Sequence, residues 1–590
     1  MNLKVFLKAN FFLWLLFSAQ IWAEIQVIAK TGQTAADFPS HFSYFNLSKP
    51  FIGPSGHIAF EGSAFDGNDY TKAVWAGLPG QLEAIVKEND TITGFPENIF
   101  FSDIASPSSF LISRSGVVAF LAELKGASTG ETALVHFNGV TQGILKPGDQ
   151  APGLPPGTVV GTVTPIAISD AGLVLAGATL RGTALWFWNF SEMELISTII
   201  GECSYVPGPG LLNINQTGSV VFNAVLAAGD EESCSSGGVF KWSNGSIELV
   251  VKDGDPVPGM PGAMFGVSIV HSPPKINDQD EIIFNAALIN IVSRSTNNSV
   301  WIKSGSNEPS LLILNGESLK EKPDHVIFAP VPMVTPILDV NFANFGYSML
   351  PVTANGIEVV LAGRPRESQP YANPSDTGAS QLTTIAIKND QPPGFGSSWF
   401  YASFSSRAIN AAEHYVFSGF ASNALENRST SAMWRGNGTG RPRLVAQKEM
   451  KLSINSAEHT LKEIYFPQNK GTHSTAGGKP SWFSDNGEIV FRGLLDNSSN
   501  SAILLITDDS KEQKIFSMAE QQFPQYFSPA NRDDQLLEGF TYRYYPTTNT
   551  YIGIKNGEVF VLGDVFGLGP QRIDTIENTL RFLEDRAGGS

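Results

Sequence analysis

The chain has 590 residues, of which 42% are hydrophobic and 16% are charged, against roughly 25% charged in an average soluble domain. This composition excludes an intrinsically disordered chain. The 56 acidic and 39 basic residues give a net charge of −17, which disfavours nucleic acid and anionic lipid as partners because like charges repel. The 57 Gly, 36 Pro and 40 Phe are typical of an all-β chain with many tight turns.

Residues 1–23 have the pattern of a secretory signal peptide. Lys4 and Lys8 precede an apolar run from Phe11 to Phe17, and the segment closes at Ala23. The run is shorter than the ~20 residues that a membrane-spanning helix requires. We therefore expect a mature chain from residue 24 that is secreted or periplasmic, has no transmembrane segment, and carries a charge near −19 after the loss of two lysines from −17.

An internal repeat follows. A short phrase of the form Asn/Ser-x-x-Gly-x-x-x-Phe recurs eight times, on average about 62 residues apart. Six copies carry Phe in the aromatic position, namely Phe60, Phe120, Phe222, Phe284, Phe417 and Phe491. Two residues later every copy has Gly or Ala, namely Gly62, Ala122, Ala178, Ala224, Ala286, Ala362, Gly419 and Gly493. In a strand these two positions share one face, so the pattern predicts a turn leading into a strand that is buried against a neighbouring sheet.

Each repeat also contains a hairpin and an acidic, Gly/Pro-rich loop, and it supplies about four strands. Units of this kind favour the blades of a closed β-propeller of about eight four-stranded blades, with nine possible. A solenoid is the alternative, but its coils are shorter than this repeat. The predicted organisation is a signal peptide at 1–23, a tandem-repeat propeller at 24–523, and a degenerate closing blade with a short helix at 524–590.

The two ends of the array predict how it closes. Residues 25–31 resemble the last strand of a repeat, and we expect them to pair with strands from beyond residue 500, because closure removes exposed sheet edges. Ile573, Ile576, Leu580 and Leu583 have helical spacing near the end of the chain. A second helix is predicted at Ser456–Tyr465.

The repeated Asn-x-x-Gly-x-x-x-Phe phrase, with its Trp-containing hairpins and Gly-Asp-x-x-Pro-Gly loops, resembles the secreted bacterial tandem-repeat family named for the NxxGxxxAF motif. The resemblance covers about residues 24–520. It implies export from a bacterium and a propeller-like array, and it implies no reaction. Members often carry a C-terminal surface anchor, whereas the segment Arg581–Ser590 has no hydrophobic tail or sorting motif.

Two further features concern sites. Cys203 and Cys234 are the two cysteines of a chain predicted to be exported, so we expect a disulfide between them. An acid recurs in the Gly/Pro-rich loops, at Asp149, Glu202, Asp255, Glu317 and Asp390. These acids either cap their own turns or, gathered at one end of the ring, hold a cation such as Ca²⁺. No other cofactor is predicted.

No catalytic motif stands out. The G-x-S-x-G match at residues 126–130 lacks the strand-to-helix context of a nucleophile elbow. The favoured function is therefore an exported, monomeric, non-catalytic binding or scaffold protein that contacts a glycan, a peptide or an envelope protein. The alternative is a carbohydrate-active enzyme, a glycosidase or a polysaccharide lyase, with carboxylates or a Tyr/Arg cluster at the central channel.

Overall fold

The structure, a computed structural model, describes two units of the chain that are treated separately: Ile25–Leu505, and a second unit from Ile506. The described residues are 25–105, 110–126, 130–179, 182–198, 212–226, 236–266, 274–290, 296–319, 322, 327–328, 341–342, 348–354, 357–363, 382–410, 414–438, 440–454, 457–465, 474–475, 482–496, 501–507, 535–537, 540–545, 550–555, 558–561 and 571–573. They form strands and turns but no helix, so this part of the chain has no helical membrane span.

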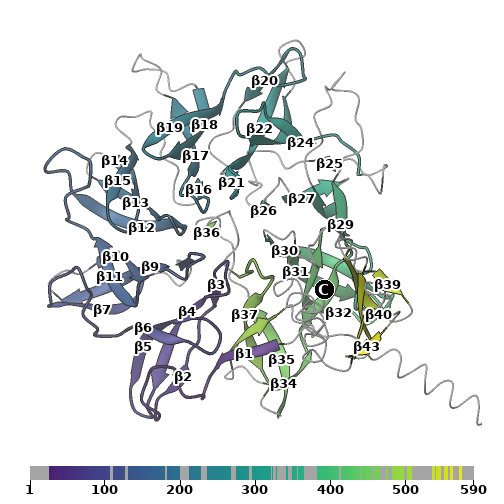
Figure 1. The fold of residues 1–590 in the computed structure, drawn as a ribbon, viewed down its shortest axis with the longest axis horizontal. Helices are drawn as coiled ribbons and strands as arrows, with labels where there is room; N and C mark the ends of the chain where they lie inside the picture. Colours follow the sequence, from purple (N-terminus) through teal and green to yellow (C-terminus); the bar gives the residue numbers. More distant parts are fainter. Residues whose placement is uncertain are drawn as a thin grey trace, which may run out of the picture. The chain divides into compact units, whose positions relative to one another are not determined.

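The unit at Ile25–Leu505 is a β-propeller (Figure 1). Its first seven sheets are built from strands that follow one another in the chain, with one short distant strand added to the third, and we call them blades 1 to 7. An eighth sheet, the closing sheet, combines strands from both ends of this unit. Sheets built from consecutive antiparallel strands need only short hairpin connections, which agrees with the high content of Gly and Pro.

The first four blades have the following strands. Blade 1 contains β2 (Ser43–Phe45), β3 (Phe51–Ile52), β4 (Ile58–Phe65), β5 (Tyr70–Gly77) and β6 (Glu83–Lys87). Blade 2 contains β7 (Ile99–Ile104), β8 (Leu111–Ile112), β9 (Val118–Gly126), β10 (Gly130–Phe137) and β11 (Val140–Leu145). Blade 3 contains β12 (Val160–Ile168), β13 (Leu173–Thr179), β14 (Gly182–Trp188) and β15 (Met193–Thr198), joined by the distant β36 (Ser474–Thr475). Blade 4 contains β16 (Leu212–Ile214), β17 (Val220–Leu226), β18 (Ser236–Ser243) and β19 (Ser246–Lys252).

The remaining sheets of the propeller follow the same order. Blade 5 contains β20 (Ala263–Gly266), β21 (Lys275–Ile276), β22 (Glu281–Asn290), β23 (Thr296–Ser304) and β24 (Ser310–Leu314). Blade 6 contains β25 (Ile327–Phe328), β26 (Asn341–Phe342), β27 (Ser348–Ala354), β28 (Ile357–Gly363) and β29 (Thr383–Ile387). Blade 7 contains β30 (Trp399–Ile409), β31 (His414–Asn423), β32 (Arg428–Asn437) and β33 (Arg443–Gln447). The closing sheet contains β34 (Lys451–Ile454), β35 (Ala457–Tyr465), β37 (Ile489–Leu495), β38 (Ser501–Ile506) and β1 (Ile25–Lys30).

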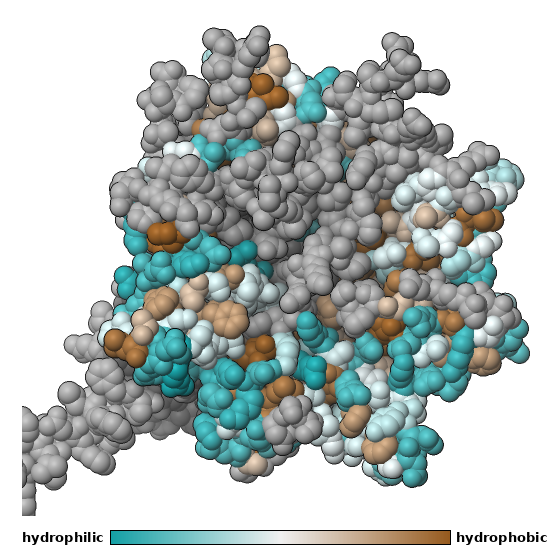
Figure 2. Space-filling model, turned by 180° about the vertical axis from the view of Figure 1, so that it is seen from behind, coloured by the Kyte–Doolittle hydropathy of each residue, from teal (hydrophilic) through white to brown (hydrophobic). Residues whose placement is uncertain are grey.

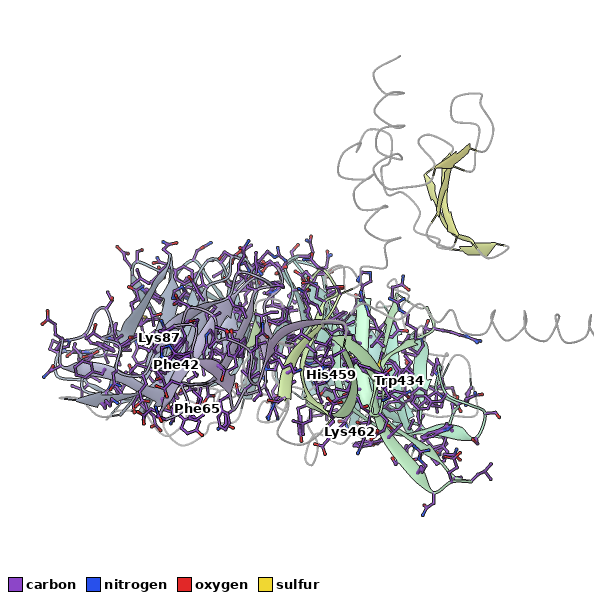
Figure 3. The ribbon with its side chains drawn as sticks, turned by 90° about the horizontal axis from the view of Figure 1, so that it is seen from below. Phe42, Phe65, Lys87, Trp434, His459 and Lys462 are labelled. Carbon is purple, nitrogen blue, oxygen red and sulfur yellow. The ribbon has the colours of Figure 1, made fainter. Side chains whose placement is uncertain are left out.

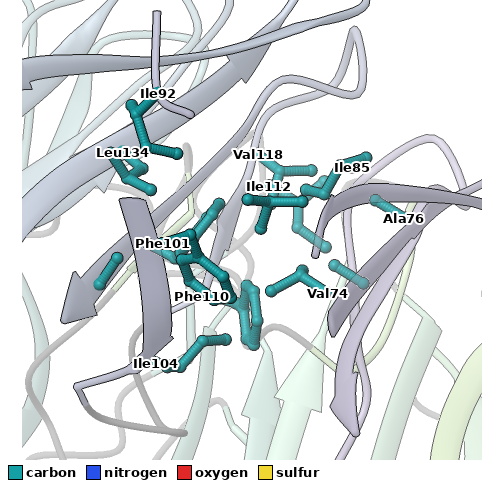
Figure 4. Close-up of a cluster of buried hydrophobic side chains, with 14 of the residues drawn as sticks. Val74, Ala76, Ile85, Ile92, Phe101, Ile104, Phe110, Ile112, Val118 and Leu134 are labelled. Carbon is teal, nitrogen blue, oxygen red and sulfur yellow. The ribbon is translucent and has the colours of Figure 1, made fainter. Parts of the chain in front are cut away.

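Neighbouring blades share apolar cores. Between blades 1 and 2, Val74 and Ala76 of β5 pack with Phe101 of β7, Ile112 of β8 and Val118 of β9 (Figure 4). Comparable clusters join each later pair of blades up to blade 7. Blades 2 to 6 are thus covered on both faces by their neighbours, and for this reason their strands are hydrophobic on both faces in the interior.

The predicted aromatic core is confirmed. Phe60, Phe120, Phe222, Phe284, Phe417 and Phe491 are each at most 3% exposed. Two of the small residues are needed for close packing within their own sheets: a Cβ added at Gly419 would lie 2.2 Å from the carbonyl oxygen of Ser403, and one at Gly493 would lie 2.7 Å from Leu461. Ser403 and Leu461 belong to the neighbouring strands of the same sheets, so the small position allows adjacent strands of a blade to approach closely.

The predicted pairing of residues 25–31 with a strand beyond residue 500 is also confirmed. β1 is the neighbour of β38 in the closing sheet, and the Thr31 N–H donates to the Ser501 carbonyl at 2.9 Å. Next to this junction the His459 ring, labelled in Figure 3, lies between Lys30 Nζ at 3.4 Å and an Asp496 carboxylate oxygen at 2.5 Å. The N-terminal strand is thus joined by backbone and side-chain bonds to the other end of the repeat array.

The helix predicted at Ser456–Tyr465 is wrong, because the segment forms strand β35, paired with β34 and β37. A bulge between Leu461 and Glu463 interrupts the two-residue alternation that would have indicated a strand. Ile573, the first residue of the other predicted helix, is instead the last residue of a strand, Gln571–Ile573. The rest of that predicted helix, up to Leu583, and the signal peptide at 1–23 lie outside the described residues.

The second unit contains one described sheet. It is made of β39 (Gln535–Leu537), β40 (Phe540–Tyr545), β41 (Thr550–Lys555), β42 (Glu558–Val561) and β43 (Gln571–Ile573). The sequence predicted that this region supplies a degenerate closing blade. The strand that pairs with β1 is instead β38, and β39–β43 pair with one another.

Candidate functional site

The predicted acidic loops begin with a tight turn that ends the outer strand of a repeat. In two of them the acid caps the turn: a carboxylate oxygen of Asp149 accepts from the Lys146 N–H, and one of Asp255 accepts from the Lys252 N–H, both at 3.0 Å. The residue before the acid is Gly148 or Gly254, with φ of 90° and 84°. This backbone conformation favours glycine, which explains the Gly-Asp pairs of the sequence.

The other predicted loop acids are placed as follows. Glu317 is buried, and its N–H closes the same kind of turn on the Leu314 carbonyl at 3.2 Å. Asp390 closes a turn on Ile387 and accepts two bonds from the Lys322 ammonium at 3.1 and 3.2 Å. Glu202 and the predicted disulfide partners Cys203 and Cys234 lie outside the described residues.

Capping is therefore the observed role of Asp149 and Asp255. Within the described part of the chain, no group of three or more His, Cys, Asp or Glu side chains is placed to hold a metal ion. Tryptophans of the hairpins anchor two of the acidic loops: the indole N–H groups of Trp186 and Trp434 donate to the carbonyls of Pro152 and Pro393. Trp75 makes the same kind of bond to Ala36, in the loop after β1.

The described turns of the repeated phrase form a hub at the middle of the ring. We call them the inner turns; the short strands β3, β16 and β21 lead into three of them around the centre of Figure 1. Within a turn, the first side chain accepts backbone bonds, as Asn215 Oδ1 does from the Ser219 N–H at 2.9 Å. The amide group of Asn215 then donates to the Asn277 carbonyl of the next blade at 3.2 Å. The Asn of the motif thus stabilises its own turn and joins it to the following one.

Charged side chains connect inner turns that are far apart in sequence. Arg114 of blade 2 contacts Asp485 of the closing sheet at 2.8 Å and Asp278 of blade 5 at 3.4 Å. Asp170 of blade 3 accepts from the Ser115 N–H at 2.7 Å, and Asp278 accepts from the Gln216 N–H at 3.1 Å. The residues that make these contacts between inner turns include Arg114, Asp170, Gln216, Asp278 and Asp485, and we call these five the hub residues.

The carboxylates of the hub influence the pKa values of the basic side chains beside them. Burial opposes the charge of Arg114, but the adjacent Asp485, Asp278 and Asp170 carboxylates outweigh it and raise the pKa of the guanidinium. Burial lowers the pKa of His57, against the attraction of Asp170. The guanidinium is held as a cation among three carboxylates from three different sheets, so the hub links blades that share no core.

We expect Arg114→Met to destabilise the protein by about 1–2 kcal/mol, because it leaves Asp278 and Asp485 without their shared cation in a partly buried site. The measurement is urea unfolding at low and high salt. The matched control is Arg428→Met, which removes the exposed ion pair with Glu426 and should change stability by no more than about 0.5 kcal/mol. Equal effects of the two substitutions would show that the hub pairing contributes nothing.

A second feature lies on the outer part of blade 1, on the face directed toward blade 2. Tyr70 of β5 stacks on Phe65 of β4 with ring centroids 4.5 Å apart and planes 20° apart. Phe45 of β2 lies 5.0 Å from Tyr70 and 5.9 Å from Phe65. Tyr70 is 52% exposed. We call Phe45, Phe65 and Tyr70 the aromatic surface; Phe65 is labelled in Figure 3.

A charged cluster separates the aromatic surface from the core shared by blades 1 and 2. Lys72 of β5 pairs with Asp103 of β7, and Lys125 of β9 pairs with Glu88 at 3.1 Å. Glu61 of β4 lies on the same face; burial and the Asp103 carboxylate raise its pKa to about 7, although Lys72 opposes the shift. The contact between the two blades therefore changes from apolar to charged along the strands.

We expect the stability contributed by Glu61 to fall as pH rises. Its pKa is 4.5 in the ordinary case and about 7 in the folded protein, so the folded state retains a proton that the unfolded chain releases in this interval. The contribution is complete below pH 4.5 and is lost through about pH 7. Glu61→Gln mimics the neutral form of the side chain. Its free energy of unfolding, measured with urea, should equal that of the wild type at pH 4 and exceed it by about 2 kcal/mol at pH 8.

The control for this prediction is Glu248→Gln, which makes the same chemical change on the exposed part of β19. A difference between Glu61→Gln and the wild type that is the same at both pH values would contradict the assignment of the shift to Glu61.

The remaining exposed apolar residues are dispersed. On the face shown in Figure 2, the described hydrophobic residues form separate patches among hydrophilic ones. Among the large ones, Leu425 is at the tip of the β31–β32 hairpin, whereas Ile247 and Leu249 lie on β19. None of these has the stacked rings of the aromatic surface.

Comparison with known proteins places the chain in a family. A family model described as a family of unknown function, DUF7453, matches residues 15–186, 214–339 and 335–500. The chain belongs to this family. No curated protein matches it. The family has no named activity, and the described part of this member forms a β-propeller.

Solved structures with some similarity are distant propeller-containing proteins and a sialidase. The β-propeller domain of the Trilobed protease from Pyrococcus furiosus is 12% identical, with 68% of this chain and 96% of that chain covered and a TM-score of 0.32. Acylaminoacyl peptidase from Pyrococcus horikoshii is 11% identical, with 71% and 58% covered and a TM-score of 0.30. Trypanosoma rangeli sialidase is 8% identical, with 92% and 70% covered and a TM-score of 0.22. Similarities this low carry no information about activity.

Proposed function

We propose that this DUF7453 protein is an exported, non-catalytic binding protein that presents its ligand surface on the faces of its blades. The observation that carries the proposal is the hub, in which the central charged groups bond to one another and to backbone N–H groups. Such a hub acts as a rigid centre, and the composite closing sheet serves as an eighth blade that completes the ring. The ligand then binds outside the centre.

The export part of the proposal follows from residues 1–23 and from the resemblance to secreted tandem-repeat proteins. The full chain, expressed in a bacterium with a periplasm, should be cleaved after about residue 23 and recovered outside the cytoplasm. N-terminal mass spectrometry of the recovered protein is the measurement. An intact residue 1 on cytoplasmic protein would contradict the proposal.

The binding part is tested by sedimentation of the purified mature chain with insoluble cell-envelope material and with purified polysaccharides. We expect saturable retention on at least one polymer, without any change in that polymer. Absence of retention on envelope material and on every purified polymer would overturn the proposal.

A carbohydrate-active enzyme remains the second candidate, because Arg114 and three carboxylates do converge at the hub. Glycosidases use a pair of carboxyl groups on either side of the scissile bond. The binding function is preferred because Asp170 and Asp278 accept bonds from the backbone of adjacent turns, as turn caps do. New reducing ends released by the wild type, and abolished by Asp278→Asn, would favour the enzyme.

A further inference from the structure

We infer that the aromatic surface of blade 1, formed by Phe45, Phe65 and Tyr70, is a binding site for a neutral carbohydrate. The inference rests on the proposed function and adds to it the location of the site and the class of ligand.

The three rings come from three adjacent strands whose register places them on one face. Phe65 faces Tyr70 directly across β4 and β5, and Phe45 faces Ser63, two residues from Phe65, across β2 and β4. Side chains two residues apart in a strand point to the same side of the sheet. The aromatic surface is therefore held by the sheet backbone, and a ligand need not pay for ordering a loop.

The rings have the geometry that a sugar requires. A pyranose ring has a face of C–H groups that packs on an aromatic ring, while its hydroxyl groups point outward from its edge. Phe65 supports one face of Tyr70 at 4.5 Å, and 52% of Tyr70 remains exposed for contact. A rigid aromatic ring with a polar tip supplies large contact area at little conformational cost, and the Tyr70 hydroxyl can bond to a sugar hydroxyl.

The polar groups around the rings favour a neutral ligand. The turn between β4 and β5 carries Asp66 and Asp69; Asp66 Oδ1 accepts from the Asn68 and Asp69 N–H groups, both at 2.8 Å. The bonds from Asp69 and Asn68 lower the pKa of Asp66 and keep it ionised. Lys72 on the same face is paired with Asp103. The carboxylates of Asp66 and Asp69 repel acidic polysaccharides, whereas their oxygens accept bonds from neutral hydroxyls.

Other exposed apolar residues do not offer this combination. Phe420 of β31 is 48% exposed, but it has no stacked ring beside it in the described part of the chain. It makes a suitable control, because replacing it removes a similar exposed area from a different blade.

The test is isothermal titration of the full mature chain with neutral oligosaccharides, namely cellohexaose, maltohexaose and mannohexaose, and with acidic hexagalacturonate. We expect at least one neutral hexasaccharide to bind and hexagalacturonate not to bind. Tyr70→Ala should weaken that binding at least tenfold, and Phe65→Leu should weaken it less, whereas Phe420→Ala should leave it unchanged. Thermal unfolding of each variant shows that the fold is retained.

The outcomes separate the site from the proposed function. If a polysaccharide binds equally well to the wild type and to Tyr70→Ala, the aromatic surface is not the site, and the binding function stands. Preferential binding of hexagalacturonate would overturn the ligand class. If no neutral hexasaccharide binds and Tyr70→Ala instead abolishes self-association in analytical ultracentrifugation, the aromatic surface is a protein contact and the inference is overturned. Failure of the envelope and polysaccharide sedimentation assays as well would overturn the proposed function itself.

Discussion

A disulfide introduced between residues 31 and 501 should form readily and stabilise the protein strongly. The hydroxyl oxygens of Thr31 and Ser501 are 3.1 Å apart, and the two residues are also joined by the backbone bond between β1 and β38. The residues are 470 positions apart in sequence. On the chain-entropy model, a loop of this length restricts the unfolded chain enough to add about 6 kcal/mol of stability.

The measurement compares urea unfolding of Thr31→Cys/Ser501→Cys in its oxidised and reduced forms, with peptide mapping to identify the bond. The two single substitutions are the controls, since each carries the same local change without the cross-link. If mild oxidation gave no bond between residues 31 and 501, the pairing of the two ends of the repeat array would be wrong.

Phe417→Ala should lower the free energy of unfolding by about 3–5 kcal/mol, the range that is typical of truncating a buried Phe. Phe417 of β31 is fully buried and stacks on Trp434 of β32, with centroids 5.5 Å apart and planes 21° apart. Tyr401 and Phe404 also pack against it. The space vacated by the ring cannot be filled without moving these neighbours, because each is fixed by its own strand.

The matched control is Phe420→Ala on the same strand. Phe420 is 48% exposed, so this substitution should change stability by no more than about 0.5 kcal/mol. Thermal and urea unfolding of both variants measure the contrast. Similar losses for the two would refute the distinction between core and surface positions of the repeated phrase.

The repeat made the core predictable. A large residue followed two positions later by Gly or Ala specifies one face of a strand, and this information is local. The same reasoning located β1, because a strand without a repeat needs a partner elsewhere. It failed at Ala457–Tyr465, where the bulge after Leu461 removed the alternation and left a spacing that also suits a helix.

The hub could not be predicted in this way. The spacing of the inner turns shows that they recur, but it does not show which of them meet across the ring. Arg114 occupies an ordinary second position of a turn, and nothing near it in sequence indicates Asp278 or Asp485. The hydrogen bonding of the motif Asn to the next turn was missed for the same reason, since its amide group has a partner one whole repeat away.

Two of the three rings of the aromatic surface are indicated by the sequence alone. Phe65 and Tyr70 flank the polar segment Asp66-Gly67-Asn68-Asp69, which is a typical hairpin turn. Two aromatic residues at the ends of a hairpin turn face each other across the strands. Only the third ring, Phe45, required the structure, because its strand is separated from the hairpin by β3.

The pairing of β1 with β38 also has a consequence in time. During synthesis the N-terminal strand is made first, and its partner follows only after about 470 further residues, which at ordinary elongation rates takes roughly half a minute to a minute and a half. The consecutive strands of blades 1 to 7 can pair as soon as they are made, whereas the edge of β1 stays unpaired until β38 is made. This one strand is therefore open to misassembly for longest, and we expect a chaperone that shields it to improve the yield more than one acting on any complete blade.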